Sequence, residues 1–83
     1  MPLFIDVHSV GNPIALEEVA QAHQADLKTQ GNYDVDYRTY WVDERNGKIF
    51  CLVEAPDAET AAAVHREAHG LVADEIHPVV EGS

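Results

Sequence analysis

The order of hydrophobic patterns along the chain is the feature that most constrains its fold. Six segments follow one another as strand, helix, strand, strand, helix and strand, separated by turn residues. The expected strands are 3–8, 35–42, 48–54 and 76–80, and the expected helices are 15–29 and 57–70. This order predicts an α+β, ferredoxin-like βαββαβ fold, in which a four-stranded antiparallel sheet carries both helices on one face.

Local signals mark where these segments begin and end. Apolar residues recur every three or four positions over residues 15–29, which indicates an amphipathic helix. The Asn46-Gly47 pair indicates the turn of a hairpin between the second and third strands. Asp57 is the expected N-cap of the second helix and Gly70 its C′ residue. The first strand should lie centrally, between the third and the fourth.

The short chain favours self-association. Its 83 residues suggest one domain, 1–83, whose core alone gives modest stability. Apolar residues point to both sides of the expected strands, as with Phe4 against Ile5 and Phe50 against Ile49. Because the helices cover only one face, we expect a homodimer of the dimeric α+β barrel type, with the bare faces packed together.

Composition excludes some partners and compartments. Fifteen acidic and five basic residues give a net charge of −10, which would repel nucleic acid. No apolar run approaches the length of a membrane span, and the N-terminus lacks the basic region of a secretory signal. We therefore expect a cytoplasmic protein that binds neither nucleic acid nor membranes.

The histidines suggest a metal site. Of five histidines, His65 and His69 are four positions apart in the second helix and so share one face. His23 falls on the apolar stripe of the first helix, and His8 follows Asp6 by two positions in the first strand. The expected topology brings several of these imidazoles near one another, between the helices and the sheet.

Which side of the first strand faces the helices stays open at this point. Asp6 and His8 share one side of the strand, and Leu3, Ile5 and Val7 share the other. The apolar pattern alone would turn Asp6 and His8 away from the helices, toward the dimer face. Convergence of the histidines requires the opposite.

Two further residues have simpler interpretations. Cys51 lies in an apolar strand and cannot form an internal disulfide, so we interpret it mainly as a small core residue. His77 precedes Pro78 at the start of the last strand and is more typical of a surface position.

Five stretches of the chain resemble small bacterial nickel-binding, nickel-responsive proteins of ferredoxin-like fold. The resemblance spans nearly the whole chain and is carried by Phe-Ile-Asp-Val-His at 4–8, Val-Ala-Gln-Ala-His-Gln-Ala-Asp at 19–26, Tyr-Trp-Val-Asp at 40–43, Phe-Cys-Leu-Val-Glu-Ala-Pro at 50–56 and Val-His-Arg-Glu-Ala-His-Gly-Leu at 64–71. It implies a dimeric, cytoplasmic nickel-binding protein without an enzymatic reaction. The metal ligands that it suggests are Asp6, His8, His23, His65 and His69.

The identity of the metal and the class of function both stay open. Imidazole and carboxylate donors suit nickel, zinc, cobalt or copper, so Ni²⁺ rests on the resemblance, with Zn²⁺ and Co²⁺ possible. One alternative is a small dimeric enzyme with a pocket on the bare sheet face near Asp6, His8, Tyr37 and Trp41. Another is a binding module for a small apolar molecule or a partner protein, built from the aromatic residues Tyr33, Tyr37, Tyr40 and Trp41. Storage, buffering and response to nickel cannot be separated by sequence.

Overall fold

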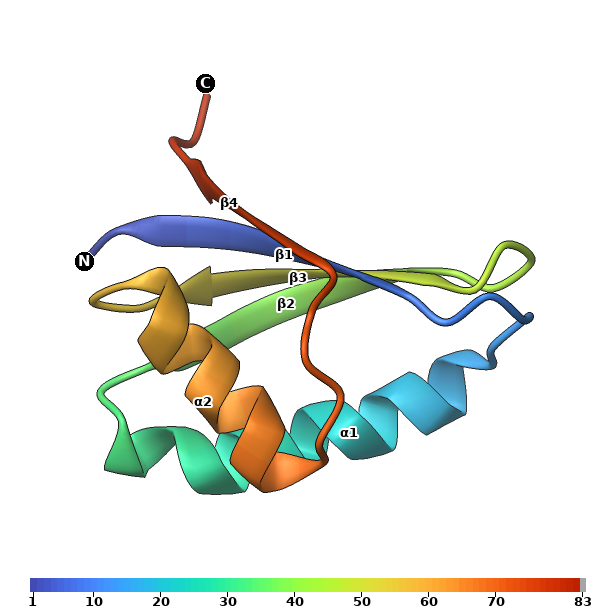
Figure 1. The fold of residues 1–83 in the computed structure, drawn as a ribbon, viewed down its shortest axis with the longest axis horizontal. Helices are drawn as coiled ribbons and strands as arrows, with labels where there is room; N and C mark the ends of the chain where they lie inside the picture. The colour runs from blue at the N-terminus through green and yellow to red at the C-terminus, as the bar shows by residue number, and fades with distance from the viewer. Residues whose placement is uncertain (83) are drawn as a thin grey trace.

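A computed structural model describes residues 1–82 and confirms the expected order of elements. Figure 1 shows a sheet with both helices on one side of it. The elements are β1 (Leu3–Ser9), α1 (Leu16–Thr29), a 3-10 turn (Gln30–Asn32), β2 (Asp36–Asp43), β3 (Lys48–Glu54), α2 (Ala58–Ala68) and β4 (Glu75–Val79). At most of the strand and helix ends, the predicted boundary differs from the observed one by one or two residues. The prediction of a ferredoxin-like fold is therefore confirmed.

The sheet is antiparallel, with the strand order β2-β3-β1-β4. β1 lies centrally, as expected, and pairs with β3 on one side and β4 on the other. In the register of β1 with β3, Asp6 lies opposite Cys51 and His8 opposite Ile49. The middle of β1 is thus next to the middle of β3, on the side of the sheet where both helices lie (Figure 1).

The helices begin with different caps. Asp57 caps α2 as expected, because its carboxylate accepts a hydrogen bond of 2.8 Å from the Thr60 backbone N–H. Ala15 precedes α1 and offers no side-chain cap. Instead the carboxylate of Glu44, in the β2–β3 hairpin, accepts the Leu16 backbone N–H at 2.9 Å. This long-range bond fixes the start of α1 against the hairpin. No helix in residues 1–82 is both long and apolar enough to cross a membrane.

The face of β1 that meets the helices carries Phe4, Asp6 and His8, all three buried. Leu3, Ile5 and Val7 point to the open face of the sheet. The prediction from apolar pattern alone is therefore wrong for this strand. Two polar residues are tolerated inside because the elements packed over them supply polar partners, as the site geometry below shows.

The hairpin glycine gives a first prediction. Gly47 has φ +64, and a Cβ at this position would collide with the backbone oxygen of Asn12. We expect Gly47→Ala to lower the free energy of unfolding by about 2–4 kcal/mol, from left-handed backbone cost plus steric strain. Urea unfolding measures it. Gly31→Ala is the matched control, since a Cβ there meets nothing within 4 Å; equal stability of the two variants would contradict the prediction.

Candidate metal centre

His65 is the centre of a buried polar cluster between the sheet and the helices. Its side chain projects from the buried face of α2 and is 2 % exposed. Its Nδ1 lies 2.8 Å from Asp26 Oδ1, and its Nε2 lies 2.9 Å from Asp6 Oδ2. Asp6 comes from β1 and Asp26 from α1, at 1 % and 3 % exposure. One imidazole therefore links β1, α1 and α2 through two buried carboxylates.

The secondary structure explains why these groups meet. In α2, His65 lies beside the buried residues Ala61 and Val64, on the face that packs inward. In α1, Asp26 shares the inward face with Val19, seven positions earlier, or two helical turns. The two helices pack on each other above β1, so the side chains at their contact reach the same point.

Two further side chains complete the surroundings of Asp6. His8 Nε2 lies 3.2 Å from Asp6 Oδ1, and the rings of His8 and His65 are 4.9 Å apart, edge to face. The hydroxyl of Tyr37 lies 3.1 Å from Asp6 Oδ2 and 2.9 Å from the Ala61 carbonyl oxygen. Tyr37 thus ties β2 to the same carboxylate.

The contacts fix the charges of the metal-free cluster. Burial alone would lower the pKa of His65, but hydrogen bonds to Asp26 and Asp6 outweigh it and raise the pKa to about 9. Burial opposes ionisation of both aspartates, yet the imidazoles hold the pKa of Asp6 and that of Asp26 below their usual range. At neutral pH, His65 is therefore an imidazolium that donates one N–H to each of two carboxylates.

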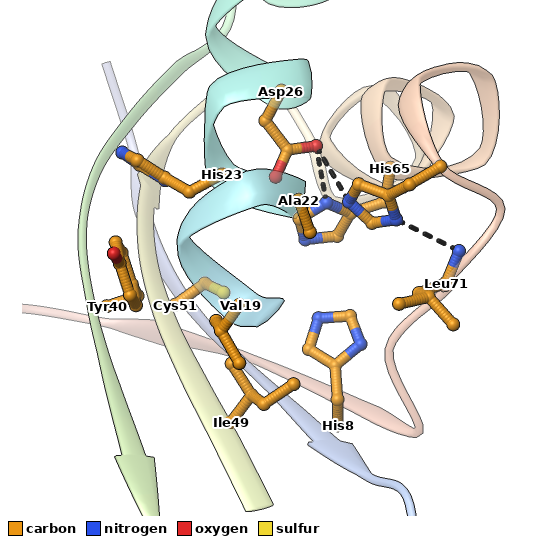
Figure 2. A pocket seen from close by; sticks show the side chains of 11 residues that line it. His8, Val19, Ala22, His23, Asp26, Tyr40, Ile49, Cys51, His65 and Leu71 are labelled. Carbon is orange, nitrogen blue, oxygen red and sulfur yellow. Dashed lines mark hydrogen bonds and ion pairs between the residues drawn. The ribbon is translucent and has the colours of Figure 1, made fainter. Parts of the chain in front are cut away.

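Among the residues that the structure describes, two groups of side chains bring their ligand atoms within 4.8 Å of one another. The inner group is Asp6, His8, Cys51 and His65, all buried. The outer group is Asp26, His65 and His69, in which His69 is partly buried and its Nε2 lies 3.1 Å from Asp26 Oδ1. His65 belongs to both groups, with a different ring nitrogen facing each. Figure 2 shows Asp26 above the imidazoles and His8 rising toward them.

The predicted ligands do not all lie in these groups. Asp6, His8, His65 and His69 come together, but His23 belongs to neither group among residues 1–82. Its ring lies 4.7 Å from that of Tyr40, and in Figure 2 it points to that side while Asp26 points toward His65. His23 does line a small cavity of about 20 Å³ whose wall also includes His8, Asp26, Cys51, His65 and His69. His77 is exposed and contacts Glu75, as expected for a surface position.

Sequence reasoning missed two members of the groups. Asp26 received no role, and Cys51 was interpreted mainly as a core residue. The burial of Cys51 agrees with that interpretation, but its polar neighbours do not. Burial, together with the charge of Asp6, raises the pKa of the Cys51 thiol. For Asp26 a signal was present, since a carboxylate on the apolar stripe of a helix needs a buried partner.

The pocket suggested for an alternative enzyme does not form as described. Asp6, His8 and Tyr37 lie under the helices, whereas Trp41 is 52 % exposed and belongs to the open sheet face. The four residues therefore do not share a pocket, because the sheet separates them.

The chain is similar to a known protein family over most of its length. The chain matches, over residues 4–79, the family model described as nickel responsive protein SCO4226-like. The crystal structure of SCO4226 from Streptomyces coelicolor A3(2) matches with a TM-score of 0.90 and 41 % sequence identity, covering 98 % of this chain and 99 % of that one. The comparison with curated proteins gave no match.

Proposed function

Since the chain belongs to the SCO4226-like family of nickel responsive proteins, we propose that it captures Ni²⁺ reversibly with buried histidine and carboxylate side chains. Residues 1–83 would act as one metal-binding domain in nickel storage, buffering or response. Bound at this site, the ion would neutralise the buried carboxylates and hold β1, α1 and α2 together.

One observation carries the proposal. Oδ1 of Asp6 is a buried carboxylate oxygen that makes no hydrogen bond, although His8 Nε2 lies 3.2 Å away. A buried acceptor left unpaired costs about 1–3 kcal/mol, so such an atom calls for an explanation. A cation at the inner group supplies one, and imidazole and carboxylate are donors that Ni²⁺ accepts.

The proposed ligands differ in how directly the geometry supports them. Asp6, His8 and His65 form the best supported set, since they belong to the buried inner group. His69 contributes through the outer group with Asp26. His23 remains in the proposal as a donor in the wall of the adjoining cavity.

Calorimetric titration tests the proposal. Tag-free, metal-stripped protein is titrated with Ni²⁺, and separately with Zn²⁺ and Co²⁺, because a tag would add histidines of its own. Stoichiometric Ni²⁺ binding is the expected result. Zn²⁺ and Co²⁺ should also bind, since these donors follow the general affinity order of divalent metals. The absence of specific binding by any of the three metals would refute the proposal.

The affinity for Ni²⁺ should rise with pH. His65 cannot bind a metal through either ring nitrogen without losing a proton, because both nitrogens donate to carboxylates at neutral pH. The pKa of about 9 means that this proton is held from pH 6.5 up to about 9. From the His65 proton alone, we expect about a tenfold rise in affinity per pH unit up to about pH 9. Titrations at several pH values measure the slope, and a flat profile would show that His65 keeps its proton.

We also propose that two copies pair through their open sheet faces. That face carries a hollow lined by Leu3, Ile5, Thr39, Trp41, Leu52, Val79, Val80 and Glu81. Exposed apolar surface of this kind is typical of an interaction site. Trp41→Glu should halve the molar mass measured by light scattering. Val72→Glu is the control, because Val72 is also exposed but lies in the loop before β4; a monomeric wild type would contradict the pairing.

A further inference from the structure

The buried thiol of Cys51 is the one donor of the inner group that the proposed function leaves unused. We propose that Cys51 is a metal ligand, so that the inner group is a mixed nitrogen, oxygen and sulfur site. This inference rests on the proposed metal binding and adds a soft donor to it.

The strand register places Cys51 beside the other donors. Cys51 in β3 lies directly opposite Asp6 in β1, and both side chains point toward the helices. Residues opposite each other in an antiparallel pair have close Cβ atoms. The sulfur lies within 4.8 Å of the ligand atoms of Asp6, His8 and His65. Cys51 is 7 % exposed and forms no disulfide, and its thiol lies beside the carboxylate of Asp6.

A second, independent feature points to an ion at this place. Asp6 is 1 % exposed and its Oδ1 has no hydrogen-bond partner. That oxygen faces His8 Nε2, another member of the same group. A cation held among these atoms would satisfy a carboxylate oxygen whose contact with His8 Nε2, at 3.2 Å, is an ion pair without a hydrogen bond.

The surroundings also argue against Cys51 as an ordinary core residue. A buried cysteine that only fills space is inert and packs as a small hydrophobe. Cys51 does contact the apolar core, but its sulfur is close to two imidazoles and a carboxylate. It also lines the cavity that His8 and His65 share.

Binding through sulfur has a simple chemical balance. The metal–sulfur bond forms as the S–H bond breaks, and the proton leaves to solvent without any change of oxidation state. Thiolate ligation favours soft and borderline metals such as nickel, zinc and copper(I), and disfavours magnesium, calcium and manganese. Cys51 would thus set the class of metal that the inner group accepts.

Near-ultraviolet absorption during the Ni²⁺ titration tests the inference. Wild-type, tag-free protein is expected to develop a sulfur-to-nickel charge-transfer band that saturates at the calorimetric equivalence point. Cys51→Ser should lose the band and bind at least about tenfold more weakly, as removal of a metal-site partner does. Cys51→Ala is a second variant without a thiol, and unfolding curves check that each variant is folded.

The outcomes separate this inference from the proposed function. If the wild-type protein binds Ni²⁺ stoichiometrically but develops no charge-transfer band, Cys51 is not a ligand. The metal site then remains in place, and the wild-type result is enough to decide this. No Ni²⁺ binding at all overturns both. Nickel-edge X-ray absorption of the loaded wild type checks for sulfur in the coordination shell, and so decides the matter even if neither variant folds.

Discussion

His65→Ala is expected to destabilise the metal-free protein by about 3–5 kcal/mol, the range for removing one partner of a buried ion pair. The imidazolium of His65 is the hydrogen-bond donor to both Asp26 and Asp6, at 2.8 and 2.9 Å. Without it, two carboxylates remain buried with little compensating charge. Because a small domain has about 5–15 kcal/mol of stability in total, this loss is a large share of it.

Urea unfolding of the metal-free variant measures this loss. His69→Ala is the matched control, because His69, the C-cap residue of α2, also faces Asp26 but its side chain is 14 % exposed. Its removal should cost less than the loss of His65, because Asp26 keeps its hydrogen bond with His65 and Asp6 keeps all its partners. If His65→Ala unfolds at the same urea concentration as the wild type, the ion-pair account of the cluster is wrong.

His8→Ala is expected to weaken Ni²⁺ binding by at least about 100-fold, because loss of a ligand should exceed the 10–100-fold effect of an outer-shell partner. His8 is buried and belongs to the inner group, where its Nε2 faces the unpaired oxygen of Asp6. Among the described side chains, its one polar contact is the ion pair with Asp6 at 3.2 Å. Its loss should therefore affect the metal more than the fold.

Calorimetry on folded His8→Ala checks this prediction. The control is His77→Ala, which removes an exposed imidazole that contacts only Glu75 in the described ion pairs. That variant should bind Ni²⁺ with unchanged affinity. An equal loss in both variants would mean that surface imidazoles, and not the buried cluster, hold the metal.

The fold was predictable because its signals are local. The Asn46-Gly47 turn, the Asp57 cap and the period of each segment act within a few residues of the chain. Together they leave the ferredoxin-like order as the natural arrangement. The cap of α1 was not predictable in this way, because Glu44 reaches it from a distant hairpin.

The site was only partly predictable because its partners are distant in sequence. Alternation along β1 separates Asp6 and His8 from Leu3 and Ile5, but does not say which set meets the helices. The answer depends on His65, which is 59 positions away from Asp6 and supplies its buried partner. Helix spacing predicted correctly that His65 and His69 lie near each other, since their rings are 4.9 Å apart.

Asp26 and Cys51 show a different limit. Each one alone has an ordinary interpretation, a helix carboxylate and an apolar-strand cysteine. Their neighbours in the structure indicate a different interpretation, since Asp26 Oδ1 lies 2.8 Å from His65 Nδ1 and Cys51 lies opposite Asp6 in the sheet. Only the packing of α1 and β3 against the cluster reveals those contacts.

The central claim is that the buried cluster around His65 holds nickel. The most direct test is a crystal structure of the tag-free protein loaded with one equivalent of Ni²⁺, with anomalous data collected at the nickel edge. We predict an anomalous peak between the sheet and the helices, at the side chains of the inner or the outer group. A peak found only at surface residues such as His77, with none in the interior, would contradict the account.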